Sequence, residues 1–333
     1  MRTAGLMILA TLLAANALGQ DVAPVATPED EVPEQVLVVG EQPGPRLWKV
    51  KSGDHVLWLM GGIGTLPKAM TWHSHEVERV IAESQQVLGG VKVDTDVGFF
   101  TKITLLPSLM SVRNNPDKQQ LADVLPDDLY QRWLKLKQQY LGNDRDVESW
   151  RPIFAAQKLY SAAIEKKGLT GRSVWFEDIE KIAKEHKVPT VTPQLLLDIQ
   201  KPRAAIRGFK KAPMEDVECF RRTLDRVEHD MDTMRLRANA WAAGDIEALQ
   251  HLPYADVVTA CANAVLNTSS AQEQGLQDVP ARIADLWVNA ADEALRKNMS
   301  TFAVVPLEEI LKPDGRVAKL VARGYVLESP ESD

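Results

Sequence analysis

Two histidines, His73 and His75, form the one local histidine cluster of the chain, and their side chains are of a type that binds metals. Neutral imidazole nitrogens hold divalent cations well, and the adjacent carboxylate of Glu76 could supply a third donor. The H-x-H pair has no third ligand at a fixed spacing, and two such polar residues also occur at the solvent-exposed start of a helix. We favour that interpretation. Nucleophilic chemistry is not indicated, because there is no G-x-S-x-G motif and Cys219 lacks the glycine-rich context of a catalytic thiol.

Two further segments, near opposite ends of the chain, share the layout of an apolar strand that runs into a loop. In residues 57–67 the loop contains Gly61 to Gly64, and in residues 302–315 it contains Pro306 to Glu309. The glycines predict a tight turn at the exit of a strand, where a ligand could approach the backbone closely. A phosphate-binding loop is not expected, because the Lys-Ser/Thr ending and the G-x-G-x-x-G spacing are both missing.

These segments, together with Leu47 to Val50 and Arg323 to Val326, resemble the TraB/GumN family, which is related to the Tiki metallopeptidases. The resemblance covers about residues 46–328, and its middle part rests mainly on residues 240–245. It implies one G-x-x-H motif in each loop, with the two histidines sharing a divalent metal. Such a metal would lower the pKa of a bound water and so supply a nucleophile.

The family-motif positions of this chain are Gly61 and Gly64 in the first loop and Pro306 and Glu309 in the second, so both histidines are replaced. Glycine has no side chain to bind a metal, whereas Glu309 could still do so through its carboxylate. The acidic residue that the family shows after the strand near residue 90 is also replaced, because residues 89–90 are both glycine. We therefore expect lost or changed chemistry, and the catalytic residues are unknown.

Three hypotheses for function follow from this pattern. The leading one is an exported, non-catalytic protein that needs no cofactor and has a binding or accessory role in the cell envelope. For that role the resemblance allows a polysaccharide-related ligand. The alternative is a peptidase-like, metal-dependent hydrolase whose ligands are displaced to His73, His75 and Glu309. The third is a structural domain that presents residues 20–45 to an unknown envelope partner.

The elements expected around these motifs are strands at both ends of the chain and helices between them. A turn signal at Gly53 predicts a hairpin of Leu47–Val50 with His55–Met60, and Ser74 is expected to cap the next helix. Further helices are predicted at 121–141, 150–167, 176–186, 215–243, 281–297 and 315–323, and further strands at 86–94, 188–191, 301–305 and 325–328. We therefore predict an α+β domain at 46–328, with a mixed β-sheet of N- and C-terminal strands and a large helical insertion at about 100–297.

Cys219 and Cys261 are the only cysteines, and both fall in segments with a helical pattern. In an oxidising compartment they could join two packed helices in a disulfide, which we favour over a pair of buried thiols. The eight tryptophans are spread along the chain. That distribution favours packing in the core over stacking on sugars.

The N-terminus has the pattern of a secretory signal peptide at 1–19, with Arg2, an apolar stretch at 6–15 and the cleavage sequence Ala-Leu-Gly at 17–19. The apolar stretch is too short for a stable membrane span, so no span is expected after cleavage and we predict a periplasmic or secreted protein. Residues 20–45 are rich in proline and acidic residues, which is typical of a flexible linker. The net charge of −7, without a long basic run, gives no reason to expect nucleic acid as a partner.

Overall fold

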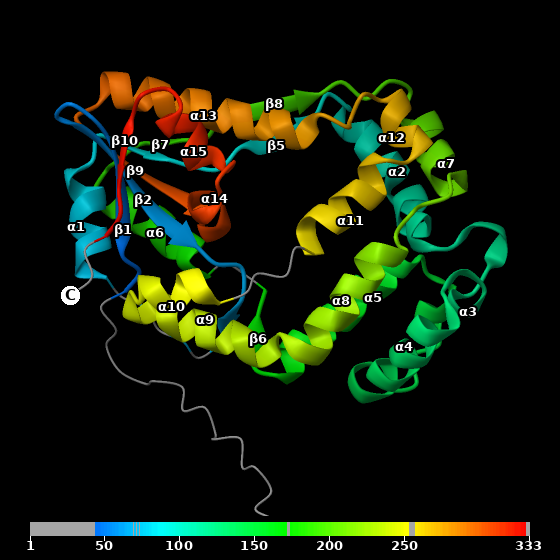
Figure 1. The fold of residues 1–333 in the computed structure, drawn as a ribbon. Helices are drawn as coiled ribbons and strands as arrows, with labels where there is room; N and C mark the ends of the chain where they lie inside the picture. The colour runs from blue at the N-terminus through cyan, green and yellow to red at the C-terminus, as the bar shows by residue number, and fades with distance from the viewer. Residues whose placement is uncertain are drawn as a thin grey trace, which may run out of the picture. The chain divides into compact units, whose positions relative to one another are not determined.

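The structure is a computed structural model that describes residues 44–330 apart from 69, 71, 73, 172–173 and 253–256 (Figure 1). The predicted signal peptide at 1–19, the predicted linker up to residue 43, and His73 lie outside the described residues. Gly44, near the end of the predicted linker, donates a backbone hydrogen bond to the Ala242 carbonyl at 2.9 Å. Among the helices of the described part of the chain, none has the length and apolar character needed to cross a bilayer.

A mixed six-stranded β-sheet joins strands from both ends of the chain. Its strands, in spatial order, are β10 (Val326–Glu328), β1 (Leu47–Ser52), β2 (His55–Gly62), β9 (Ser300–Pro306), β4 (Gln86–Leu88) and β7 (Thr190–Val191). The hairpin of β1 and β2 turns at Gly53, whose φ of 58° is a left-handed conformation that glycine adopts without strain. The predicted α+β class, with a sheet of N- and C-terminal strands, is confirmed.

Strands β2, β9, β4 and β7 run parallel, so their carboxyl ends meet at one edge of the sheet. Gly62 at the end of β2 lies opposite Pro306 at the end of β9. Both loops singled out in the sequence therefore leave the sheet at this edge. In open sheets with parallel strands, ligands commonly bind in crevices beyond the carboxyl ends.

Helices occupy most of the described chain between the strands. They are α1 (His75–Glu83), α2 (Phe99–Met110), α3 (Leu121–Val124), α4 (Asp127–Tyr140), α5 (Pro152–Lys166), α6 (Val174–Glu185), α7 (Pro202–Lys211), α8 (Val217–His229), α9 (Met231–Ala243), α10 (Ile246–His251), α11 (Val257–Leu266), α12 (Ser269–Glu273), α13 (Val279–Lys297), α14 (Leu307–Leu311) and α15 (Arg316–Val321). Helix α13 packs on β1, β2 and β9 and on α15. Its buried face includes Trp287, Val288 and Ala291, because side chains three and four positions apart share one side of a helix.

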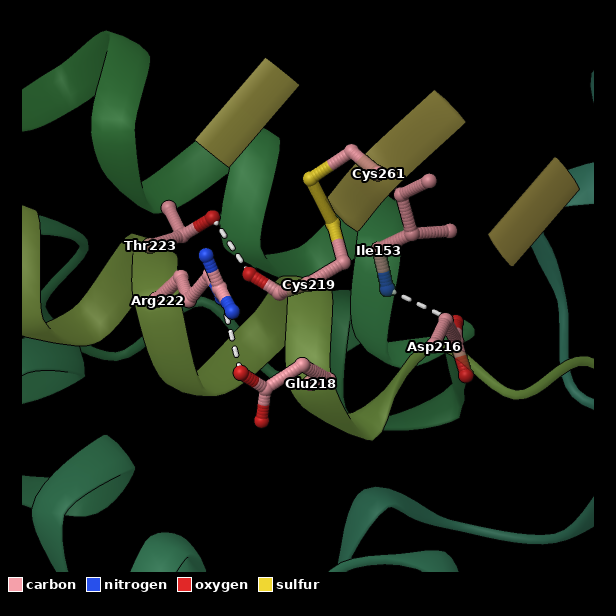
Figure 2. Close-up of a disulfide and its surroundings, with 7 residues drawn as sticks. All are labelled: Ile153, Asp216, Glu218, Cys219, Arg222, Thr223 and Cys261. Carbon is pink, nitrogen blue, oxygen red and sulfur yellow. Dashed lines mark hydrogen bonds and ion pairs between the residues drawn. A yellow bond between two sulfur atoms is a disulfide. The ribbon is translucent and has the colours of Figure 1, made fainter. Parts of the chain in front are cut away.

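A second hydrophobic core lies among the helices, separate from the core around the sheet. Trp133 of α4 packs against Phe220 of α8 with 5.6 Å between ring centroids, and Leu159 of α5 is fully buried in the same cluster. The disulfide between Cys219 and Cys261 joins α8 to α11, as Figure 2 shows. This confirms the predicted pair, whose two cysteines are 42 residues apart in the sequence.

Two helices that the sequence predicts as continuous are each broken in the structure. The one at 121–141 is interrupted at Pro126, which lacks the N–H group that a helix interior needs. The one at 215–243 divides into α8 and α9 at Asp230, whose carboxylate contacts Arg226 and Arg237. No proline or glycine marks the second break, and the contacts of Asp230 at this point are with residues four and seven positions away in the chain.

The strand predicted at 86–94 is divided between two sheets. Its first part is β4, whereas β5 (Lys92–Thr95) pairs with β8 (Gln194–Leu197) in a separate sheet, and β3 (Leu66–Pro67) pairs with β6 (Leu169–Thr170). The division occurs at Gly89, where a Cβ would lie 2.9 Å from Thr192 Oγ1. A side chain at this position would therefore have to displace the Thr192 hydroxyl of the neighbouring segment.

Candidate functional site

The two motif-bearing loops meet at the carboxyl edge of the parallel strands. The Gly61 carbonyl accepts a hydrogen bond from Trp241 Nε1 at 2.6 Å, which ties the first loop to helix α9. A Cβ at Gly61 would lie 2.6 Å from Leu307 Cδ1, at the start of α14, so the second segment is helical from Leu307 onward where the sequence predicts a loop. Gly61 is therefore needed for the close packing of the two loops.

Gly64 differs from Gly61, because nothing described around it requires a glycine. Its φ lies outside the left-handed region, and no described heavy atom comes within 4 Å of the position that a Cβ would take. A side chain here would project into open space without displacing its neighbours. The last position of the first motif thus has room for a side chain, and this chain has none there.

The Glu309 carboxylate, at the last position of the second motif, is engaged at the start of helix α15. Its Oε2 accepts a hydrogen bond from the Arg316 backbone N–H at 3.1 Å and lies 3.6 Å from Arg316 Nε. The first N–H groups of a helix have no partner within the helix, so an acidic side chain there is stabilising. Gly315 allows the close approach, since a Cβ there would lie 2.3 Å from the Glu309 carbonyl oxygen.

Of the predicted metal ligands, the structure describes His75 and Glu309, while His73 lies outside the described residues. His75 is the exposed first residue of α1 and follows Ser74, whose hydroxyl accepts a hydrogen bond from the Val77 N–H at 3.3 Å. Within the described ranges, no group of three His, Cys, Asp or Glu side chains is placed to hold a metal ion. A metal site made of His73, His75 and Glu309 stays a prediction.

A cavity of about 730 Å³, which we name the arginine pocket, opens beside the first loop. Its walls come from residues 62–65, from helices α5, α8 and α9, and from the start of α14. The charged side chains along it are Lys68, Glu165, Arg226, Arg237 and Glu308. Lys68 and Glu165 form an exposed ion pair at 3.6 Å.

Both arginines contact the carboxylate of Asp230, at the junction of α8 and α9. Asp230 Oδ1 lies 3.4 Å from Arg237 Nη2, and Oδ2 lies 3.6 Å from Arg226 Nε. Desolvation by burial raises the pKa of Asp230, and the charges of Arg237 and Arg226 oppose that rise. The Arg226 guanidinium also lies 5.2 Å from the centroid of the Tyr160 ring, and Tyr160 Oη lies 3.1 Å from Thr65 Oγ1.

A second cavity, of about 760 Å³, extends along the carboxyl edge of β4, β9 and β2, and we name it the apolar pocket. Most of its lining is aliphatic or aromatic, including Val87, Trp175, Phe176, Ile179, Ile283 and Val304. Trp175 Nε1 donates a hydrogen bond to the Ile63 carbonyl at 3.0 Å, which positions the indole against the first loop. Residues 62–64 and Pro306 line both pockets, so the two cavities are neighbours that share the first loop as a wall.

The sequence does not single out the side chains that line these pockets. Arg226 and Arg237 fall in one predicted helix among many charged positions, with no spacing that distinguishes them. Five of the eight tryptophans are buried in the cores, as the sequence predicts, and these are Trp48, Trp72, Trp133, Trp241 and Trp287. Trp175 is partly exposed and lines the apolar pocket instead. The one useful signal is the glycine-rich loop, which predicts room for a ligand.

The model of one protein family, described as TraB/PrgY/gumN, matches the chain over residues 46–329. The match begins just before β1 and ends just after β10, so it includes the sheet, both motif-bearing loops and the helices between them. No curated protein and no solved structure gave a significant match to the chain.

Proposed function

We propose that this protein, which belongs to the TraB/PrgY/gumN family, has a binding or accessory role without catalysis. A ligand would occupy the arginine pocket and the apolar pocket, beside Gly64. One observation about Gly64 and Glu309 carries the proposal. Gly64 has no side chain to bind a metal, and the Glu309 carboxylate already accepts a hydrogen bond from the Arg316 N–H.

Metal-assisted hydrolysis needs about three protein ligands and an open position for water. Glu309 could join such a set only by giving up its hydrogen bond and ion pair with Arg316. The Arg316 side chain is only 18% exposed, so losing its carboxylate partner would cost free energy. The position of Glu309 therefore favours a structural role over a role as a metal ligand.

Binding without chemistry is supported by the shape of the same region. The two cavities, of about 730 and 760 Å³, have the volume of typical small-molecule sites. They lie at the carboxyl edge of parallel strands, and the space beside Gly64 is open. A ligand could therefore contact the loop backbone directly at a position where the family resemblance implies a histidine.

We also propose that the protein acts outside the cytoplasm, in the periplasm or after secretion. The disulfide between Cys219 and Cys261 is of a kind that persists in oxidising compartments. Residues 1–19 have the composition of a cleaved signal peptide. The ligand or partner would then belong to the cell envelope, and a polysaccharide is one class that the family resemblance allows.

A peptidase-like, metal-dependent hydrolase is the second candidate. It is favoured by the short sequence distance from the first loop to His73 and His75, which would bind the metal with Glu309. In that case the carboxylate of Glu309 would have to leave Arg316 when the metal binds.

Metal analysis of the purified protein separates the two candidates. We expect no stoichiometric divalent metal, and no difference between the wild type and a His73→Ala/His75→Ala double variant. A His186→Ala/His229→Ala double variant is the matched control, because both of its histidines lie singly near carboxylates at 3.4 and 3.6 Å. Stoichiometric metal that is lost only from the His73/His75 variant would overturn the non-catalytic proposal and favour the hydrolase.

A further inference from the structure

A third cavity, of about 870 Å³, is formed by the segment 111–120 and the second half of helix α7. It shares no lining residue with the arginine pocket or the apolar pocket. Its described lining contains one carboxylate, that of Asp117, and four cations, which are Lys118, Arg207, Lys210 and Lys211. We name this cavity the lysine pocket.

The four cations of the lysine pocket have no partner in the part of the chain that the structure describes, because none of their side chains takes part in an ion pair, a hydrogen bond or a ring contact there. Arg207 and Lys211 are four residues apart and exposed on one face of α7, so their charges repel each other. The chain as a whole has a net charge of −7, so this cluster runs against its overall balance. A bound anion would offset the repulsion.

The position of Lys210 and Lys211 in the last turn of α7 has an ordinary explanation, since cations there commonly stabilise the final carbonyl groups of a helix. In this helix the buried side chain of Arg151 has that role. Its Nη2 donates hydrogen bonds to the carbonyls of Phe209 and Lys210 at 3.0 and 2.9 Å, and its Nη1 donates one to the Ala212 carbonyl at 3.1 Å. The two lysines are therefore not needed for these carbonyls and remain available to a ligand.

Arg151 also fixes the two walls of the lysine pocket against each other. Its backbone N–H donates a hydrogen bond to the Arg113 carbonyl at 2.7 Å, and its Nε donates one to the Asn114 carbonyl at 3.4 Å. On the same wall, Asn115 is only 8% exposed and donates from Nδ2 to the Trp150 carbonyl at 2.8 Å. Because buried contacts set both walls, the backbone positions that carry the cations are in place before a ligand binds, which favours affinity.

The rest of the described lining is polar, apart from Pro116. It consists of the hydroxyl groups of Ser111 and Ser149 and the amide groups of Asn114, Asn115 and Gln120. Hydroxyl and amide groups donate hydrogen bonds to anionic oxygens, whereas an acyl chain or an aromatic ring would find little to pack against. The ligand that suits this lining is therefore hydrophilic.

We propose that the lysine pocket binds a small, hydrophilic anion with three or more negative charges, carried on phosphate or carboxylate groups. Four cations and one carboxylate leave three positive charges to be neutralised (4 − 1). The lysines would act as point charges, and Arg207 would bind one anionic group through two parallel hydrogen bonds. A volume of about 870 Å³ is typical of small-molecule sites. The inference is independent of the proposed function, because the two concern different cavities.

Matched probes test the chemical class without any change to the protein. Tripolyphosphate and citrate each carry about three or more negative charges above neutral pH, whereas acetate carries one. Calorimetry at constant ionic strength measures the affinity of each, and the preferred probe distinguishes phosphate from carboxylate groups. We expect at least one of the two polyanions to bind about tenfold or more tightly than acetate. Equal binding of all three, or no binding of either polyanion, would overturn the inference.

Variants of the two α7 lysines test the location of the site. Lys210→Gln/Lys211→Gln should weaken binding of the preferred polyanion about tenfold or more and should fold normally by thermal unfolding. The matched control, Lys135→Gln/Lys158→Gln, removes the same charge from exposed positions of α4 and α5 that do not line the lysine pocket, so its affinity should stay unchanged. Unchanged binding in the first variant, or an equal loss in both, would overturn the inference.

A change at Asp117 should have the opposite sign. Asp117→Asn removes the carboxylate that faces the four cations and should tighten binding of the polyanion about threefold. Asparagine tolerates the left-handed backbone of this residue, whose φ is 53°, as aspartate does. The control is Asp54→Asn, in the exposed turn between β1 and β2, which should leave the affinity unchanged. Unchanged or weaker binding in Asp117→Asn would contradict the placement of the anion and overturn the inference.

Discussion

Replacing Glu309 tests whether its carboxylate stabilises the fold, as the structure indicates. Glu309→Ala removes the acceptor of the Arg316 N–H at 3.1 Å and the ion pair with Arg316 Nε at 3.6 Å. The two side chains are only 23% and 18% exposed, so solvent screens them in part. A charge-assisted hydrogen bond contributes about 1.5–3 kcal/mol and a carboxylate at a helix start about 0.3–1 kcal/mol, and the two effects overlap. We therefore expect the free energy of unfolding to fall by about 2 kcal/mol.

The neighbouring residue provides the control. Glu308→Ala makes the same chemical change in the first turn of α14, but Glu308 is more exposed than Glu309, at 37% against 23%, and lies 3.9 Å from Lys312. A surface pair of this kind contributes little, so the loss should stay within about 0.5 kcal/mol. Glu309→Gln keeps an acceptor oxygen without the charge and should fall between the two alanine variants. Urea unfolding followed by tryptophan fluorescence measures all three.

Two outcomes would refute this reasoning about Glu309. The first is equal loss of stability in the Glu308 and Glu309 alanine variants, which would show that the contact with Arg316 contributes nothing specific. The second is unchanged stability in Glu309→Ala together with loss of a bound metal. That result would identify the carboxylate as a ligand and would favour the hydrolase.

Two further predictions concern the helical region. In the Cys219→Ala/Cys261→Ala variant, the free energy of unfolding should fall by about 4 kcal/mol, from the chain-entropy model for a separation of 42 residues. Urea unfolding measures this change, and unchanged stability would show that packing alone holds α8 to α11. Asp216 accepts a hydrogen bond from the Ile153 N–H at 2.9 Å (Figure 2), and burial raises its pKa, opposed by backbone hydrogen bonds and by the charge of Arg151. The protonated Asp216 therefore stabilises the fold fully at a pH below its ordinary pKa of 3.8. This contribution is lost as the pH rises through the raised pKa of the folded state. Asp216→Asn keeps an acceptor and should reduce the pH dependence of unfolding in that window, and identical pH slopes for variant and wild type would contradict the effect of burial.

Local signals in the sequence were sufficient to predict turns and helix ends where one residue sets the backbone conformation. Gly53 adopts the left-handed turn between β1 and β2, Ser74 caps α1 through its hydroxyl, and Gly244 ends α9 with a φ of 71°. Each of these follows from the backbone conformations or hydrogen bonds that the single residue can adopt or form. The same is true of Pro126, which interrupts the helical pattern at 121–141 between α3 and α4.

Contacts between distant segments were not available from such signals. Strand β5 pairs with β8, a strand that the periodicity does not indicate. Arg226 and Arg237 look like ordinary positions of a charged helix. Whether such side chains face water or a cavity depends on how α8 and α9 pack against α5 and the sheet edge.

The sequence by itself determined the family and the α+β class, because these depend on residue types, periodicity and spacing along the chain. The tertiary structure alone decided that the Glu309 carboxylate binds the start of α15, that Gly64 lies beside open space, and that Arg226 and Arg237 line a pocket where both contact Asp230. The physical reason is that the partners of a side chain are set by the packing of elements that are far apart in the sequence, and this packing leaves no mark on local residue patterns.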